Sequence, residues 1–371
     1  MRAIDKAARP NITIAVIIKP NGDRSQATTI GSISVIMFFI YYTPIKLHNQ
    51  YNYVNKNIRS SSQFTPDKKE KAVITLSNGF SFEFVTGSGS LKYGLGWAHE
   101  RLLIRLGLIN PRLFANVMKT PTIPPRKGNY VWWHPWTCIR PIFEGGKLVG
   151  IVNSVGLTNP GPDWVAEHVG PKLDSKKVPV IASVHGEETA GIRIANRIFN
   201  DIDVVAVELN AWCPNTGNQI SDSDTVIRQA EAVKEESAHP VLVKLSPVHD
   251  FLYIVPRLVG IAEAIDINSV PWPIVFPNRK SPLQGFFGCG MPGAVSGKKA
   301  QPHTWACARE IKRMGLIPVI CPSMWSLEDV VQMLDSEKFP AVSFASRHIP
   351  FAWLPTRYVR QYQALHWKVA E

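Results

Sequence analysis

The feature that most constrains the fold is a repeated alternation, from about residue 73 onward, of short Val- and Ile-rich runs with longer helical stretches. The clearest strand-like runs lie at 178–184 (VPVIASV), 203–209 (DVVAVEL) and 240–245 (PVLVKL), with weaker ones at 264–270, 317–321 and 341–345. Such almost continuously apolar runs fit strands that are buried on both faces. The sequence therefore predicts a parallel sheet.

The stretches between these strands predict helices at 187–198, 223–236 and 301–314. Each predicted strand ends in a polar or Gly-rich cluster before its helix begins. A repeat of strand, loop and helix is the pattern of a (β/α)8 barrel or of a doubly wound sheet. Because about 300 residues run on without an obvious break, the sequence favours a (β/α)8 TIM barrel over residues 73–371.

Residues 1–72 differ from the rest, and we interpret them as an N-terminal extension. The segment 29–45 is apolar, and a polar linker rich in Asn, Ser and Lys follows it. This apolar segment is shorter than the roughly 20 residues of a spanning helix, and Pro44 interrupts its end. It also lies far from Met1 and lacks a small-residue cleavage site, which argues against a secretory signal.

Three interpretations of the extension stay open: a membrane anchor, a β-rich local extension, or translated sequence upstream of the true start. Arg24 and Lys46 flank the apolar segment, so charge gives no clear orientation. We expect a cytoplasmic protein, with membrane association through residues 29–45 as the open alternative.

Composition narrows the classes of function. The 371 residues are 45% hydrophobic and 19% charged, which supplies a sizeable core and excludes a disordered chain. Lys and Arg outnumber Asp and Glu by 41 to 29, but the charges are scattered, so we prefer a diffuse basic surface to nucleic-acid binding. The five cysteines are widely spaced without a CxxC pair, so we predict no metal site, no disulfide framework and a reducing compartment.

The reactive groups of a barrel lie at the C-terminal ends of its strands. Reading those ends in chain order collects lysines, amides, a thiol and a hydroxyl: Lys119, Asn153, Asn210, Cys213, Asn215, Lys244, Asn268 and Ser269. The set has no paired carboxylates and no histidine with a carboxylate partner, which argues against glycoside hydrolysis and a Ser-His-Asp site. Amides donate and accept in one plane, so they suit a flat, amide-bearing ring such as a pyrimidine, and lysines suit anionic groups.

Several of these segments resemble the dihydroorotate dehydrogenase family. The most specific matches are NSVGLTNPG (153–161), ELNAWCPNTG (208–217) and VKLSP (243–247), in the family's order. Weaker likenesses are KTPTIPPRKGN (119–129), GFSFEFVTGSG (79–89), and GAVSG (293–297), which is similar to the family's Gly-Gly-Leu-Ser-Gly loop. The resemblance runs from about residue 74 to 347. It implies an FMN-binding (β/α)8 barrel that oxidises dihydroorotate to orotate in pyrimidine synthesis.

The resemblance also implies roles. Cys213 would be the base that removes the C5 proton of dihydroorotate while the C6 hydride passes to FMN, and Cys here points to the family's soluble class 1. Lys119 would favour the thiolate, and Lys244 would stabilise the reduced flavin ring. Substrate binding would fall to Lys119, Asn153, Asn210, Asn215, Asn268 and Ser269. Cofactor binding would fall to Gly87, Ser88, Gly89, Lys119, Lys244, Asn268, Gly297, Ser323, Ser346 and Arg347.

The two loops expected to hold the FMN phosphate depart from the family pattern. A Gly-Gly pair and a Gly-Thr pair are replaced by CPSM (321–324) and FASR (344–347). Pro322 has no N–H, so we expect one donor to be lost and the conformations that favour glycine to be unavailable. Ser323, Ser346 and Arg347 can compensate with hydroxyl and guanidinium groups. Weak FMN binding and a diverged paralogue are the alternatives.

The partner and the exact reaction keep alternatives. VKLSP resembles the subtype that passes electrons to NAD through an iron–sulfur flavoprotein subunit; quinone or fumarate would be the acceptor otherwise. The rival enzymes are dihydropyrimidine dehydrogenase-like and dihydrouridine synthase-like FMN reductases, and a different class is a catalytically inactive barrel scaffold. The oligomeric state stays open, with a homodimer as one option.

Overall fold

The computed structural model describes residues 72–131, 133–185, 189–211 and 222–367, and the structural statements below refer to these ranges. The chain divides into two units, Met1–Lys69 and Glu70–Glu371, and the described ranges belong to the second. The apolar segment 29–45 and the predicted site residues Cys213 and Asn215 therefore lie outside the described residues.

Eight parallel strands form the barrel that the sequence predicts. They are β3 (Phe84–Thr86), β4 (Ala115–Val117), β7 (Val180–Val184), β8 (Ala206–Asn210), β9 (Val241–Leu245), β10 (Ala264–Ile267), β13 (Ile320–Cys321) and β14 (Ala341–Phe344). Their hydrogen-bonded order is β10-β9-β8-β7-β4-β3-β14-β13. A parallel bridge between Ile265 and Val319 joins the two edge strands, so the sheet closes on itself.

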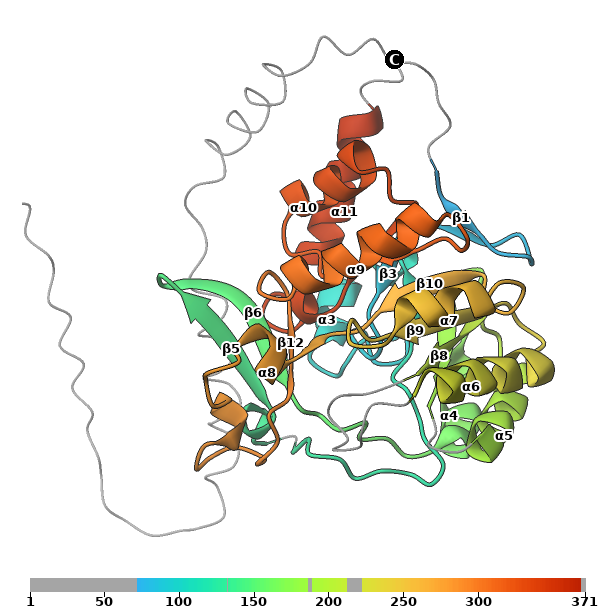
Figure 1. Ribbon diagram of the computed structural model, residues 1–371, viewed down its shortest axis with the longest axis horizontal. Helices are drawn as coiled ribbons and strands as arrows, with labels where there is room; N and C mark the ends of the chain where they lie inside the picture. The colour runs from blue at the N-terminus through green and yellow to red at the C-terminus, as the bar shows by residue number, and fades with distance from the viewer. Residues whose placement is uncertain (1–71, 132, 186–188, 212–221, 368–371) are drawn as a thin grey trace, which may run out of the picture. The chain divides into compact units, whose positions relative to one another are not determined.

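The helices lie outside the strands, and α4, α5, α6 and α7 pack as successive neighbours along one side of the barrel (Figure 1). The α-helices are α3 (Glu100–Arg105), α4 (Pro162–His168), α5 (Thr189–Asn200), α6 (Ser223–Glu236), α7 (Phe251–Arg257), α8 (Trp272–Val275), α9 (Gln301–Met314), α10 (Leu327–Val331) and α11 (Leu354–Trp367). Local signals set their ends. The Asp222 side chain accepts from Thr225 N–H at 2.9 Å before α6, and Gly315 ends α9 at φ 66°.

Alternate residues of each strand face opposite sides of the barrel wall. Along β7, Val180, Ala182 and Val184 pack in the large apolar cluster shared with the helices. Ile181 instead packs in a second cluster with Ala206, Leu242, Ala264 and other residues of the barrel interior. Both faces of each strand are therefore apolar near its start, which explains the continuous Val/Ile runs in the sequence.

A short antiparallel hairpin covers the N-terminal end of the barrel. Its strands β1 (Ile74–Thr75) and β2 (Ser81–Phe82) contribute apolar side chains to the interior cluster. At its turn, Asn78 Nδ2 donates to the carbonyl of Val205, just before β8, at 2.9 Å. This end of the barrel is thus filled by apolar packing, and the functional groups are left to the other end.

A second sheet corrects three expectations. Its antiparallel strands, in the order β11-β12-β6-β5, are β11 (Val270–Pro271), β12 (Ala294–Ser296), β6 (Lys147–Asn153) and β5 (Ile139–Glu144) (Figure 1). The run 264–270 is therefore two strands in different sheets, and 293–297 is a strand with flanking glycines, not a loop. Asn153 ends β6 of this sheet and does not end a barrel strand.

Within the described ranges, no helix is long and apolar enough to cross a membrane. Short 3-10 turns connect several elements, namely η1 (Pro111–Leu113), η2 (Pro135–Thr137), η3 (Gly170–Lys172), η4 (Pro282–Gln284) and η6 (Ser346–His348), and a π-helical turn, η5 (Gln332–Ser336), follows α10.

Candidate active site

The predicted site residues that the structure describes lie mostly at one end of the barrel. Lys119 follows β4, Asn210 ends β8, Lys244 lies near the end of β9, and Asn268 follows β10. Parallel strands carry all four C-terminal ends to the same rim, which we call the mouth. These residues were grouped from the sequence because each stands near the end of a predicted strand, and the observed strand order brings those ends together.

The segment after β3 lies against the segment after β4. The Ser88 hydroxyl donates to the Met118 carbonyl at 2.9 Å. Gly89, at φ +75°, lies so close to Lys119 that an added Cβ would stand 3.4 Å from the Lys119 Cβ. Gly87 is needed for a different contact, because a Cβ there would lie 2.6 Å from the Cβ of Ala345 after β14. Ser88, Gly89 and Lys119 are thus neighbours on the mouth.

A polar layer lies one step above the apolar interior, toward the mouth. Ser183, Glu208, Lys244 and Asp266 each stand two residues beyond an interior apolar residue on β7, β8, β9 and β10, so they share its face. Lys244 donates to Glu208 Oε1 in a short ion pair, with the two side chains 6% and 1% exposed. Asp266 is the strand-register partner of Lys244 and is also buried.

This layer corrects the expectation that the site lacks paired carboxylates. Burial is the largest cause that raises the pKa of Asp266, to about 7, and the nearby Glu208 carboxylate raises it further. The Lys244 ammonium opposes both effects. Both carboxylates are buried and inaccessible to a bulky substrate, however, so they cannot serve as a glycoside hydrolase pair.

A chain of hydroxyl groups connects this layer to the segment after β3. Ser88 Oγ and Thr120 Oγ1 are 2.9 Å apart, and Thr120 Oγ1 and Ser183 Oγ are 2.8 Å apart. Ser183 Oγ donates onward to Glu208 Oε1 at 3.4 Å. Ser88 is half-buried, whereas Thr120 and Ser183 are fully buried, so the chain leads from the mouth into the barrel.

The strand-end amides lie above the polar layer. Asn210 is buried, and its Oδ1 has no hydrogen-bond partner among the residues that the structure describes. Asn268 Oδ1 accepts from the Ser269 N–H at 2.8 Å and its hydroxyl at 3.3 Å, which orients the Asn268 amide. A buried amide oxygen without a partner is costly unless a ligand satisfies it.

The altered loops after β13 and β14 correct one expectation. Ser323 has φ 67°, so the backbone keeps the left-handed conformation that glycine usually takes, despite Pro322 before it. Its carbonyl accepts from Gln301 Nε2 at 3.0 Å, which holds the loop. Ser346 is buried at the start of η6.

Arg347 supplies a cation to the same region. Its guanidinium carbon lies 4.5 Å from the centre of the Trp325 ring, and Nη2 donates to Tyr358 Oη at 3.1 Å. Its Nε is buried and has no hydrogen-bond partner within the described ranges. Trp325 in turn covers Gly297, where a Cβ would lie 2.6 Å from the indole. Gly297, Trp325 and Arg347 therefore form one packed group, which joins the second sheet to the loops after β13 and β14.

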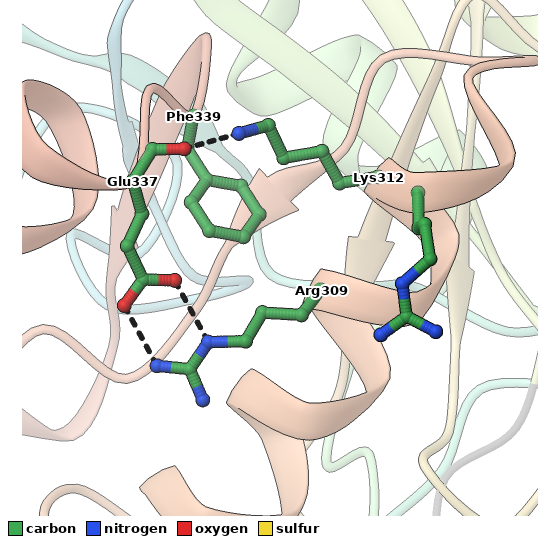
Figure 2. Close-up of a pocket in the computed structure, with 5 residues that line it drawn as sticks. Arg309, Lys312, Glu337 and Phe339 are labelled. Atoms are coloured by element: carbon green, nitrogen blue, oxygen red, sulfur yellow. Dashed lines mark hydrogen bonds and ion pairs between the residues drawn. The ribbon is translucent and has the colours of Figure 1, made fainter.

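A surface pocket away from the mouth has a structural explanation. It measures about 280 Å³ and is lined by Arg309, Lys312, Arg313, Glu337 and Phe339. As Figure 2 shows, the Glu337 carboxylate accepts two hydrogen bonds from Arg309, both 2.7 Å, and its carbonyl accepts from Lys312. This pocket lies at the end of α9 and the start of β14, opposite the mouth. Its cations stabilise that turn.

Sequence reasoning missed Thr120, Ser183, Glu208 and Asp266. The signal was present, because each of the last three is a polar residue inside an almost apolar strand, in register with the interior face. Lys244 was predicted as a site residue from its position near a strand end, whereas its carboxylate neighbours, Glu208 on β8 and Asp266 on β10, were not. A period-two reading of every strand predicts the whole layer.

The fold and the mouth define a (β/α)8-barrel protein with a polar, cationic site at the C-terminal ends of its strands. Residues 115–332 match the family model described as Dihydroorotate dehydrogenase. The chain is 30% identical over 260 residues to the catalytic subunit of dihydroorotate dehydrogenase B (NAD(+)) of Desulforudis audaxviator, covering 67% of this chain and 76% of that protein. It is 30% identical over 262 residues to the protein of the same name from Bacillus pumilus, covering 67% and 77%.

A solved structure supports the fold alone. The crystal structure of DHODH in complex with ferulenol, from Eimeria tenella, superposes with a TM-score of 0.56 at 14% identity, covering 88% of this chain and 93% of that one. The family match and the coverage of the relatives decide the assignment: the chain belongs to the dihydroorotate dehydrogenase family. Members of this family are FMN-dependent oxidoreductases that act on CH–CH groups and oxidise dihydroorotate in pyrimidine biosynthesis.

The residues of the mouth fit FMN. A flavin offers ring carbonyls and nitrogens at one end and a phosphate dianion at the other. The Lys244 ammonium and the Asn268 amide would suit the ring, and the buried Arg347 Nε, without a partner in the described ranges, would suit the phosphate.

Proposed function

We propose that this chain oxidises (S)-dihydroorotate to orotate at the barrel mouth, with FMN as its cofactor. The observation that carries the proposal is the Lys244 ammonium, held by Glu208 in the polar layer directly below the strand-end amides. FMN, when bound, supplies a two-electron acceptor for the substrate hydride. The remaining work of binding, orientation and proton transfer falls to side chains of this chain.

Lys244 stabilises negative charge on the cofactor ring. An ammonium has three N–H donors, and the bond to Glu208 occupies one of them. The others serve an acceptor on the mouth side. Since the side chain is only 6% exposed, its charge acts through a medium of low dielectric and is fixed before the reaction. Two further cations serve the site. Lys119 lies beside Gly89, and Arg347 serves the phosphate end of the cofactor.

The substrate ring lies against the amides. Asn210 Oδ1 accepts from a ring N–H, which removes the cost of an unsatisfied buried oxygen. Asn268, oriented by Ser269, presents its amide in the same rim. Asn153, on the second sheet, and Asn215 complete the set that binds the ring and its carboxylate.

Cys213 is the base in this proposal. It follows Asn210 by three positions in the sequence, and a thiol whose pKa is lowered by nearby cations can accept a proton near neutral pH. The test is anaerobic single-turnover reduction of the bound flavin by dihydroorotate in Cys213→Ser. We expect reduction to slow by at least about 100-fold at pH 7, with orotate affinity nearly unchanged.

Cys289→Ser is the matched control, because Cys289 is half-buried and free. It should reduce at the wild-type rate. Equal rates for Cys213→Ser and the wild type would remove Cys213 as the base while leaving the flavin assignment intact.

The electron acceptor is the second part of the proposal. Two similar proteins are named catalytic subunits of dihydroorotate dehydrogenase B (NAD(+)), a name that implies a further subunit in those enzymes. We propose that this chain also acts with a partner, an iron–sulfur flavoprotein that passes electrons to NAD+. A reduced enzyme that is reoxidised by NAD+ only after that partner is added would support this. Direct reoxidation by quinone would instead support membrane association through residues 29–45.

A further inference from the structure

The polar layer in the barrel interior carries one carboxylate more than it has cations. Glu208 and Lys244 form an ion pair of zero net charge, and Asp266 stands beside them on β10. Its side chain is buried, and Asp266 Oδ1 has no hydrogen-bond partner among the residues that the structure describes. A buried carboxylate without full compensation is costly, so the group changes its protonation state readily when its surroundings change.

The charged and titratable groups around Asp266 place its pKa close to neutral pH. Burial and Glu208 raise its pKa to about 7, against the opposing effect of Lys244. Cys321 on β13 is a further titratable neighbour among the described residues, and burial raises the pKa of that thiol well above its usual value. Cys321 therefore stays neutral, and Asp266 is the group that changes charge around pH 7.

The hydroxyl chain gives the layer a connection to the mouth. The links Ser88–Thr120, Thr120–Ser183 and Ser183–Glu208 measure 2.9, 2.8 and 3.4 Å. When the Ser88 O–H turns from the Met118 carbonyl to Thr120, the hydroxyl hydrogens donate in the same direction at every link, from Ser88 toward Glu208. Such an aligned chain can pass a proton from the half-buried Ser88 to Glu208, which water does not reach. Glu208 passes a proton on to Asp266, because the two carboxyl groups are within hydrogen-bond reach.

We propose that Asp266 is a charge-compensating positioning residue: it takes up a proton from solvent, through the Ser88–Thr120–Ser183–Glu208 chain, whenever negative charge develops beside Lys244. The proton converts the carboxylate to a carboxylic acid, and no electron passes through it. The layer then changes from a net charge of −1 to zero, so Lys244 keeps its full effect on the neighbouring anion. Asp266 touches neither substrate nor cofactor in this account and acts through Lys244.

In the catalytic cycle, the negative charge is that of the reduced flavin, so this part rests on the proposed function. The two electrons and the proton within the hydride come from dihydroorotate, and the extra proton comes from water. If reduction raises the pKa of Asp266 by about one unit, the wild type takes up about half a proton more than a variant without this carboxyl, at the pH midway between the two values.

The first measurement is proton uptake during anaerobic dithionite reduction of the FMN-loaded protein, from pH 6 to 9. The wild type should show excess uptake between about pH 7 and 8, and Asp266→Asn should not. Glu100→Gln is the matched control, because burial also raises the pKa of Glu100 to about 7 but its carboxylate accepts from the Trp97 N–H at the start of α3, outside the polar layer. It should keep the excess. Equal uptake in wild type and Asp266→Asn would overturn the proposal.

The second measurement needs no flavin. The infrared difference spectrum of the apoprotein, wild type minus Asp266→Asn, should show a protonated-carboxyl band that disappears between pH 6 and 8. The subtraction removes the band of Glu100, whose pKa burial also raises to about 7. Glu208→Gln removes a carboxylate that raises the pKa of Asp266, so it should shift the disappearance to lower pH. A wild-type spectrum that Asp266→Asn leaves unchanged between pH 6 and 8 would overturn the proposal. Failure of the wild type to bind FMN would instead count against the proposed function, and the infrared result would stand independently.

Discussion

Replacing Lys244 by Met tests the energetics of the polar layer most severely. The substitution keeps an unbranched apolar side chain close to the length of the lysine stem but removes the ammonium that pairs with Glu208. Glu208 and Asp266 would then be two buried carboxylates without a cation in the layer. Breaking a buried ion pair by removing one partner costs about 3–5 kcal/mol of stability. We expect a loss of this size at pH 8.5.

The pH dependence gives this prediction its sign. The pKa of Asp266 in the folded protein is about 7, above its ordinary value, so the folded state binds more protons and stability from this group falls as pH rises toward 7. Without Lys244, which lowers the pKa of Asp266, that pKa rises further, and the loss extends to higher pH. At pH 5.5 protonation neutralises buried carboxyl charge, so the difference from wild type should shrink by about half or more.

The assay is urea unfolding at both pH values. Lys177→Met is the control, since Lys177 pairs with Asp174 on the surface with its side chain 70% exposed, and such pairs contribute little. The double variant Lys244→Met/Glu208→Gln should recover a large part of the loss, because it removes one of the unpaired carboxylates. A pH-independent loss, or one below about 1 kcal/mol, would refute the reasoning about charge in this layer.

Three further substitutions test single features of the mouth. Gly87→Ala should cost about 1–3 kcal/mol of stability, because its Cβ would lie 2.6 Å from that of Ala345. Adding Ala345→Gly should restore a large part of the loss, and no loss in the single variant would contradict the contact. Ser323→Gly should raise the free energy of unfolding by up to about 1 kcal/mol, because glycine adopts the φ of 67° at this position without strain. A lower unfolding midpoint would contradict this and show that the serine side chain is needed. If Arg347 holds the phosphate as proposed, Arg347→Met should weaken FMN binding about 10- to 100-fold in fluorescence titrations and leave binding of riboflavin, which has no phosphate, unaffected. An equal loss for both ligands would contradict that role.

Much of the fold could be predicted because each strand carries its own signal. The predicted helices 223–236 and 301–314 coincide with α6 and α9, whose apolar stripes and end signals lie within the segment itself. The run 264–270 was predicted as one strand, yet β10 ends at Ile267 and the chain turns at Asn268 and Ser269 into β11. Apolar periodicity does not reveal that turn, because both short strands are buried.

The site residues that the sequence predicted are those that stand at the end of an individual strand. Lys119, Asn210, Lys244 and Asn268 do share the mouth, because parallel strands bring their ends together. What position along the chain does not show is pairing between strands. Glu208 and Asp266 become neighbours of Lys244 only through the register of β8, β9 and β10. The left-handed Ser323 was likewise unexpected, since tertiary packing of the loop overrides local preference there.

The most direct test of the proposed function is anaerobic addition of dihydroorotate to the purified, FMN-loaded full chain while the flavin absorbance is recorded. The proposal predicts that the yellow flavin band bleaches with dihydroorotate, that orotate appears in equal amount, and that NADPH alone leaves the band unchanged. A band that persists with dihydroorotate, or that bleaches with NADPH alone, would contradict it.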